Sequence, residues 1–277
     1  MKVRELAYLF GFRPPPRTYG SEVRQFQLPV DGLVEYAAWL HPAETPKVIG
    51  QEAVDELRTF LRPGDVAIDI GAHTGDTAIP MALAVGRSGR VLALEPNPYV
   101  YPVLERNAAL NPARTAIVPL PFAATARAGP VSFDYSDAGF CNGGRHEGIS
   151  RWRHAHAFSV RVRGENLQAY LAAHHADLVP RLRYIKVDAE GHDLTILESL
   201  AGIIATVRPF VRAEVYRHTA AVGRQRLHAF MSGHGYDVHR VGGETCYRGD
   251  QLAAADMTRE PQFDIFCVPH STGLDVP

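Results

Sequence analysis

The sequence has 277 residues and a formal net charge of -1, with 46% hydrophobic and 21% charged residues. This composition is typical of a globular protein with one large core, and it excludes a disordered or fibrous chain. The balanced charge gives no overall field that would attract nucleic acid or an anionic membrane, and no apolar run approaches transmembrane length, so neither partner is expected.

The cysteines indicate a reducing compartment. There are three, Cys141, Cys246 and Cys267, and they are far apart with no C-x-x-C spacing, which argues against a disulfide framework or a zinc ribbon. The apolar run near the amino terminus is too short for a signal peptide and is followed by "RPPPR". We therefore expect a cytoplasmic protein.

The first 50 residues are predicted to form an extension and a candidate lid. Prolines in "RPPPR" and "HPAETP" are expected to break any long element within the first 45 or so residues. The remaining residues, 51–277, are expected to form one domain.

From residue 51 onward, predicted helices and strands alternate. Apolar runs predict strands at 66–70, 91–95 and 115–120, and helical patterns precede, separate and follow the first two. Asn97 is predicted to cap the helix at 98–110, with Pro98 at its first position. An insertion at about 122–163 contains two further strands, and after it come helices and strands in alternation: helices at 165–175, 194–202 and 224–235, and strands at 184–188, 209–215, 236–241 and 263–268. This order predicts an α/β doubly wound sheet with a ligand at the carboxyl ends of its strands.

The first predicted strand and turn, "VAIDIGAHTG", indicate the ligand. A nicotinamide-binding turn usually reads G-x-G-x-x-G, but here the order is Asp69, Gly71 and Gly75. An acid beside this turn suits a cationic group, and a helix beginning near Thr74 would offer N–H groups to a carboxylate. Glu95, at the end of the next strand, is placed to accept hydrogen bonds from ribose hydroxyls. Together these residues favour S-adenosylmethionine over NAD.

The motifs "DIGAHTG", "LEPNP", "IKVDAEGHD" and "AEV" resemble those of the FkbM family of S-adenosylmethionine-dependent methyltransferases, over roughly residues 51–269. The resemblance implies a Rossmann-like seven-stranded class I methyltransferase sheet with helices on both faces and an antiparallel last strand. It also implies O-methylation of a hydroxyl, often on a sugar or natural product. By the same resemblance, the methionine end of the cofactor is lined by Asp69, Gly71, Ala72, His73 and Gly75, and the ribose by Glu95. Phe122 and Ala123 are assigned to the adenine by position alone.

A second group of polar residues follows the later strands. Lys186 and Asp188 share one face of a predicted strand, and Glu214 lies in "VRAEV", so Lys186 is expected to pair with a carboxylate. Asp188, His192 and Glu214 are predicted to converge beside the transferred methyl group, with Lys186 in the same catalytic group. We favour His192 as the base. The alternative is that the three hold a Mg²⁺-type ion.

The acceptor is expected to lie against the insertion. Trp152 is suited to stacking on a sugar ring, and Arg151 and Arg153 to holding a phosphate. Glu190 is a further candidate acceptor contact. A small-molecule or saccharide acceptor is therefore expected, and a homodimer is expected only from the general frequency of two-fold assemblies.

Two other functions remain open from the sequence: a non-catalytic module that binds an adenosyl ligand, and a nicotinamide-dependent dehydrogenase. Detection of methyl transfer would exclude the first. The missing middle glycine disfavours the second.

Overall fold

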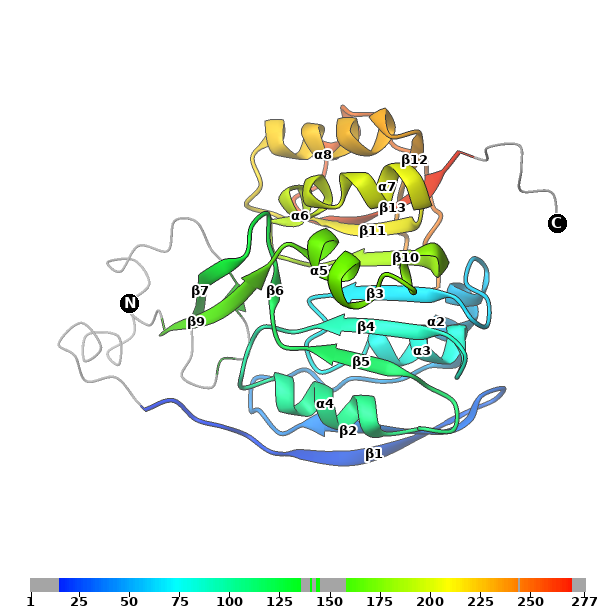
Figure 1. The fold of residues 1–277 in the computed structure, drawn as a ribbon, viewed down its shortest axis with the longest axis vertical. Coiled ribbons are helices and arrows are strands. Elements are labelled where there is room, and N and C mark those ends of the chain that lie inside the picture. Colours follow the sequence, from blue (N-terminus) through cyan, green and yellow to red (C-terminus); the bar gives the residue numbers. More distant parts are fainter. Residues whose placement is uncertain (1–14, 136–139, 141–142, 145–157, 244, 271–277) are drawn as a thin grey trace.

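A seven-stranded sheet forms the centre of the protein in the computed structural model, which describes residues 15–135, 140, 143–144, 158–243 and 245–270 (Figure 1). The strand order is β12-β13-β11-β10-β3-β4-β5. The last strand, β13, runs antiparallel to both of its neighbours, and the other six are parallel to one another. The predicted fold class is confirmed. The bounds are β3 (Val66–Ile70), β4 (Arg90–Leu94), β5 (Ile117–Leu120), β10 (Leu182–Val187), β11 (Phe210–Val215), β12 (Tyr236–Arg240) and β13 (Phe263–Pro269).

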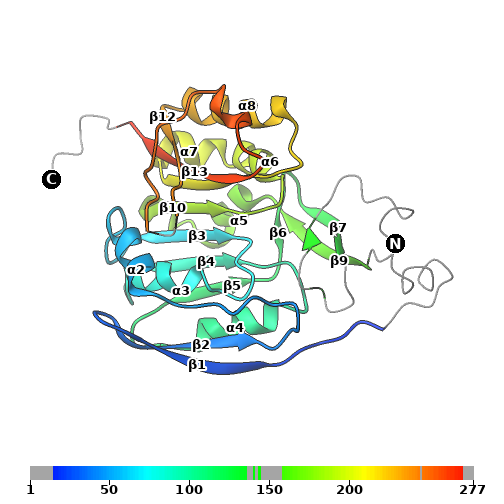
Figure 2. The same ribbon diagram turned by 180° about the vertical axis from the view of Figure 1, so that it is seen from behind.

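Helices cover both faces of this sheet, as Figures 1 and 2 show from opposite sides. Alternate residues of β3 enter different cores: Ile68 packs in one apolar cluster and Ala67 in the other, as the two-residue period of a strand requires. The Ile68 side is covered by α5 (Leu167–His174), α6 (Asp193–Ser199), α7 (Ala201–Val207) and α8 (Ala221–Gly233). The Ala67 side is covered by α2 (Gln51–Arg58), α3 (Ala78–Val85) and α4 (Tyr101–Ala109).

A long hairpin precedes the main domain. Strands β1 (Ser21–Leu28) and β2 (Gly32–Trp39) pair antiparallel over their whole length. The expectation that prolines break every long element in this region is therefore wrong for residues 21–39. The prolines lie outside the two strands, with Pro29 in the connecting turn, where a missing N–H costs no ladder hydrogen bond.

Two asparagines, one in α4 and one just after it, attach the hairpin to this part of the chain. Asn107 Oδ1 accepts from the Ala37 N–H at 2.6 Å, and Asn111 Oδ1 accepts from the Glu35 N–H at 2.9 Å. Their amide groups donate back to the carbonyl oxygens of the same two residues. On the edge of β2 that does not pair with β1, these side chains provide hydrogen-bond partners for the backbone. These bonds hold the hairpin beside α4 (Figure 1).

Two predicted helix starts are corrected. The helix expected from Pro98 begins at Tyr101, because Asn97 closes a turn: its Oδ1 accepts from the Tyr99 N–H and its Nδ2 donates to the Phe140 carbonyl. The helix expected near Thr74 begins at Ala78, after the turn that follows β3.

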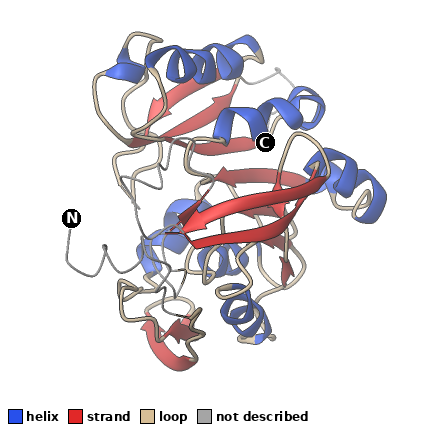
Figure 3. Ribbon diagram, turned by 90° about the vertical axis from the view of Figure 1, so that its left-hand side faces the viewer, coloured by secondary structure: helices blue, strands red, loops and turns tan. Residues whose placement is uncertain are grey.

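The insertion forms a second sheet at the carboxyl edge of the main one. Its order is β6-β9-β7-β8, and the two predicted strands are present as β7 (Gly129–Tyr135) and β9 (Phe158–Glu165), with the short β6 (Ala123–Ala124) and β8 (Gly143–Gly144). Viewed from the carboxyl ends of the parallel strands, the insertion strands lie in front of the main sheet (Figure 3). Within the described part of the chain, no helix is long and apolar enough to cross a bilayer.

Candidate functional site

A pocket of about 630 Å³ opens at the carboxyl ends of β3, β4 and β10, the edge predicted to bind a ligand. Strand β7 of the insertion contributes Phe133 and Tyr135 to its wall, and the segment after the hairpin contributes Glu44 and Lys47. The pocket is therefore built from the main sheet and two attachments to it.

The turn after β3 requires glycine for two different reasons. Gly71 lines the pocket at φ +79°, and a Cβ there would lie 2.2 Å from the carbonyl oxygen of Asp188. Gly75, at φ +94°, faces the other way, where a Cβ would lie 3.0 Å from Leu104 of α4. Ala72 is fully buried in the core beside α3. Both residues shape the turn from its core side, and their predicted contact with the ligand stays a prediction.

Asp69 is also a support for the pocket. It has no exposed surface, its Oδ2 accepts from the Thr77 hydroxyl at 2.6 Å, and its Oδ1 lies 3.3 Å from Lys186 Nζ. The predicted carboxylate partner of Lys186 is therefore Asp69. Burial raises the pKa of Asp69, and the ammonium of Lys186 opposes that rise by favouring the carboxylate. The predicted role of Asp69 towards a cationic ligand stays a prediction, and in this structure its carboxylate lies beside the Lys186 ammonium.

Glu95 lies on the pocket wall, where the sequence placed it. Its Oε2 accepts from the His73 N–H at 2.9 Å and its Oε1 from the Asn97 N–H at 2.7 Å. Burial raises the pKa of Glu95, and His73 and the two backbone donors oppose this by favouring the charged form. A carboxylate has about four acceptor positions, so each oxygen keeps a lone pair for a ligand hydroxyl.

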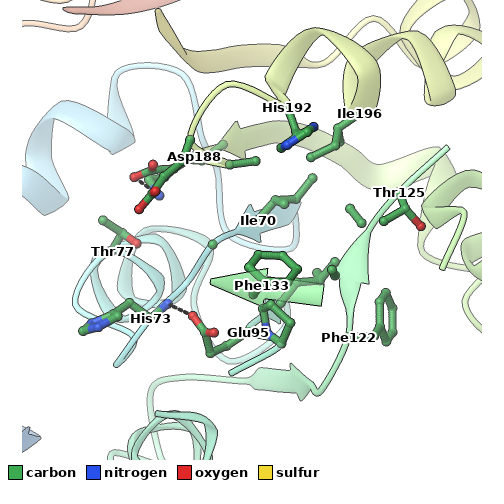
Figure 4. Close-up of a pocket in the computed structure, with 18 of the residues that line it drawn as sticks. Ile70, His73, Thr77, Glu95, Phe122, Thr125, Phe133, Asp188, His192 and Ile196 are labelled. Carbon is green, nitrogen blue, oxygen red and sulfur yellow. Dashed lines mark hydrogen bonds and ion pairs between the residues drawn. The ribbon is translucent and has the colours of Figure 1, made fainter. Parts of the chain in front are cut away.

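The two ends of the pocket differ in chemistry, with Glu95 between them (Figure 4). On one side lie His73, Thr77 and Asp188, and on the other Phe122 and Thr125. Phe122 packs against Tyr170 with the ring centroids 4.6 Å apart, and Ala123 follows it on the wall. One end is therefore polar and charged, and the other is mainly apolar, with the hydroxyl of Thr125 as a polar group on its wall.

Strand β10, with Lys186, and the loop after it, with Asp188, Glu190 and His192, carry predicted site residues to the pocket. All four residues line it. The side chain of Asp188 is 49% exposed, with its Oδ2 3.4 Å from Lys186 Nζ. Glu190 adopts φ +47°, which gives the loop a sharp bend before α6.

Glu214 lies behind this loop rather than on the pocket wall. Its carboxylate accepts from the Gln262 amide, and its N–H donates to Asp193 Oδ1 at 3.2 Å. Burial, together with the charges of Asp188, Asp193 and Asp264, raises the pKa of Glu214 to about 8. Of the three residues predicted to converge, Asp188 and His192 line the pocket and Glu214 lies beside Asp193, so a catalytic role for Glu214 stays a prediction.

Asp193 is a buried residue that the sequence analysis missed. Its Oδ2 accepts from the Gly191 N–H at 3.3 Å, so it ties the loop to β11 through Gly191 and Glu214. Burial, with the nearby charge of Asp188, raises its pKa to about 7. An acid directly after the turn in "AEGHD" was the available signal.

The remaining predictions concern a metal and the acceptor. Among the described residues, no group of three or more His, Cys, Asp or Glu side chains could hold a metal ion, so the alternative of a magnesium site at Asp188, His192 and Glu214 finds no geometric support. Arg151, Trp152 and Arg153 lie outside the described residues.

The family model for the methyltransferase FkbM domain matches residues 69–238 of this chain. The chain belongs to the FkbM methyltransferase family. The resemblance carried by "DIGAHTG", "LEPNP" and "IKVDAEGHD" is thereby confirmed.

Relatives of this FkbM chain include a hexuronic acid methyltransferase, AglP, of Haloferax volcanii, which is 26% identical over 167 residues. That match covers 60% of this chain and 62% of AglP, so the chain spans less than two thirds of the relative's length. Among solved structures, a methyltransferase FkbM from Methylobacillus flagellatus is 14% identical with a TM-score of 0.45, covering 77% of this chain and 50% of that one. Aeropyrum pernix fibrillarin with natively bound S-adenosyl-L-methionine is 14% identical with a TM-score of 0.42, covering 91% and 99%.

Proposed function

We propose that this FkbM chain is an S-adenosylmethionine-dependent O-methyltransferase that acts on a hydroxyl of a sugar, a glycan or a natural product. Family membership supports methyl transfer, and the likeness to a protein named a hexuronic acid methyltransferase supports a saccharide acceptor. The observation that carries the proposal is the position of Glu95 between an apolar and a charged end of one pocket.

The pocket can hold the parts of S-adenosylmethionine in order. Glu95 accepts hydrogen bonds from the ribose hydroxyls, and the chain at Phe122 and Ala123 borders the adenine. Gly71 and His73 border the methionine end.

Bound S-adenosylmethionine would supply a sulfonium methyl group, whose carbon an acceptor oxygen would attack in line, forming an O–C bond as the C–S bond breaks and S-adenosylhomocysteine leaves. His192 is the proposed base and takes the hydroxyl proton. Asp188, on the same loop, is placed to orient the acceptor or the imidazole. The ammonium of Lys186, paired with Asp69 and Asp188, offsets the negative charge of these two carboxylates at the edge of the sheet.

Calorimetric titration with S-adenosylmethionine and with NAD tests the proposal. The protein is expected to bind the first and not the second. Glu95→Ala should weaken binding by about 1.5 to 3 kcal/mol, because charge-assisted hydrogen bonds to the ribose are lost. Glu198→Ala, on the exposed side of α6, is the control and should bind as the unchanged protein does. Unchanged affinity in a folded Glu95→Ala variant would remove the ribose assignment.

Methyl-labelled S-adenosylmethionine, offered with a panel of sugars, sugar nucleotides and macrolide-type alcohols, then tests catalysis. We expect the labelled methyl group to appear in an acceptor, bonded to an oxygen atom. Donor binding without transfer to any acceptor would instead favour the non-catalytic adenosyl-binding module. Binding of NAD in place of the donor would favour the dehydrogenase.

A further inference from the structure

The segment that follows the hairpin reaches the charged end of the pocket. Ala43, Glu44, Thr45 and Lys47 line it, although they lie outside the matched family region at 69–238. A tight turn fixes the start of the segment, because the Ala43 N–H donates to His41 Nδ1 at 3.0 Å and the Glu44 N–H donates to the His41 carbonyl at 3.0 Å.

Aromatic contacts hold this segment against the turn after β3. The ring of Trp39 lies 4.8 Å from that of His41 and 5.8 Å from that of His73. Because His73 belongs to the glycine turn, the end of the hairpin and the ligand turn form one packed unit. The segment after the hairpin is therefore positioned relative to the pocket.

Opposite charges face one another across this junction. Lys47 Nζ lies 3.1 Å from Asp76 Oδ2 and 3.9 Å from Glu44 Oε1, and Glu44 Oε1 lies 4.0 Å from His73 Nδ1. The side chain of Lys47 is 32% exposed. Burial alone would lower the pKa of Lys47, but Asp76 and Glu44 more than offset it and raise that pKa, so the ammonium stays charged.

Lys47 differs from Lys186, the other lysine on the pocket wall. Lys186 is buried between Asp69 and Asp188, and Asp69 has no exposed surface. Its charge is needed there, because an unpaired buried carboxylate is costly. Lys47 instead pairs with Asp76, whose side chain is 21% exposed, so water can solvate that carboxylate when the lysine turns to a ligand.

We propose that Glu44, Lys47 and Asp76 form a subsite for the zwitterionic amino-acid end of the donor, in which Lys47 binds the carboxylate and the two acids face the ammonium. The proposal rests on the proposed function. If Glu95 holds the ribose and Phe122 borders the adenine, the remaining substituent of the ribose extends towards the end of the pocket where His73 and Thr77 lie (Figure 4). Glu44, Lys47 and Asp76 line the same pocket, and Glu44 Oε1 lies 4.0 Å from His73 Nδ1. An α-amino carboxylate offers one charge of each sign, which matches the charges of the subsite.

Three ligands separate recognition of the tail from recognition of the nucleoside. S-adenosylhomocysteine carries the whole amino-acid tail. Decarboxylated S-adenosylmethionine differs from the donor only by the missing carboxylate, and 5′-methylthioadenosine has no amino-acid tail. By calorimetry, Lys47→Met should weaken S-adenosylhomocysteine by about tenfold to a hundredfold. Its affinity for the two ligands without a carboxylate should stay within about twofold of the unchanged protein.

Binding of 5′-methylthioadenosine also reports that the variant pocket is folded. Lys47→Arg should recover most of the affinity for S-adenosylhomocysteine, and Arg226→Met, on the exposed side of α8, is the control for loss of a surface cation. Equal weakening of all three ligands, or no weakening of any, would overturn the subsite. Failure of the unchanged protein to bind any adenosyl ligand would instead overturn the proposed function.

Discussion

At the scale of single residues, the pocket depends on which groups share one edge of the sheet. Gly71 allows the turn to pass beside Asp188, and Glu95 receives two backbone N–H groups where a ligand can reach it. His192 is brought to the same pocket by a bend at Glu190. Two residue-scale predictions follow from these positions, one for the base and one for the turn.

His192→Ala should lower turnover by about 10² to 10⁴, because general-base catalysis by a positioned side chain contributes that much. Donor affinity should be unchanged in the same variant. Initial rates with labelled donor and calorimetry check the two parts. His270→Ala, at an exposed position just after β13, serves as the control. Activity that is lost with a chelator and restored by Mg²⁺ would transfer the role from the imidazole to a metal.

Gly71→Ala should abolish donor binding and destabilise the fold by several kcal/mol. The cause is protein backbone, since the added Cβ would lie 2.2 Å from the Asp188 carbonyl oxygen at a φ of +79°, where side chains are strained. Denaturant unfolding and calorimetry measure both effects. Gly233→Ala is the control: nothing lies within 4 Å of its added Cβ and it is the last residue of α8, so stability should stay the same or rise by less than about 1 kcal/mol. A Gly71→Ala variant with unchanged stability would contradict the turn geometry.

At the scale of elements, the hairpin is joined to the pocket through α4. Asn107, which is fully buried, bonds both backbone groups of Ala37 and also donates to the Thr74 carbonyl at 2.7 Å. One amide therefore connects β2, the ligand turn and α4. The placement of the donor pocket and the docking of the hairpin are linked through this side chain.

Asn107→Ala should lower the free energy of unfolding by about 1 to 3 kcal/mol, because buried backbone groups of β2 and the turn lose their partners. It should also weaken binding of the donor, since Thr74 belongs to the turn. Leu227→Ala, which leaves a cavity under α8 at the other end of the sheet, should cost about 2 to 5 kcal/mol with donor affinity unchanged. Loss of stability without any loss of affinity in Asn107→Ala would show that the link is not used.

At the scale of the whole molecule, buried acids make stability depend on pH. Glu214 faces Asp188, Asp193 and Asp264, with the Gln262 amide as its hydrogen-bond donor. Its pKa is raised from an ordinary 4.5 to about 8. Between these two values the folded protein keeps a proton that the unfolded chain releases, so stability falls as the pH rises.

Glu214→Gln should therefore reduce the fall in the free energy of unfolding between pH 5 and about 8, because the amide stays neutral in both states. Urea unfolding at several pH values measures the slope for the two proteins. The exposed variant Glu198→Gln should keep the slope of the unchanged protein. Equal slopes in all three proteins would show that Glu214 is ionised throughout this range.

The amino-acid sequence by itself determined the layers of this protein. Strand and helix order, the fully buried strand "VAIDI" and the glycine turn after it follow from local properties, namely side-chain period, backbone conformation and turn chemistry. Glu95 could be placed for the same reason: it ends a parallel strand, and parallel strands end at one edge. The hairpin does not follow from the proline content of this region, because the prolines lie in its turn and on its flanks and not within its strands.

Only the tertiary structure decided which charges meet. Lys186 pairs with Asp69, which is 117 residues away in the chain, and Lys47 lies beside Asp76 across the end of the pocket. It also placed Ala72 and Gly75 on the core side of the turn, and Glu214 behind the loop rather than on the pocket wall. The energy of an ion pair or a buried carboxylate depends on distance and burial, which follow from how distant elements pack and not from neighbouring residues in the chain.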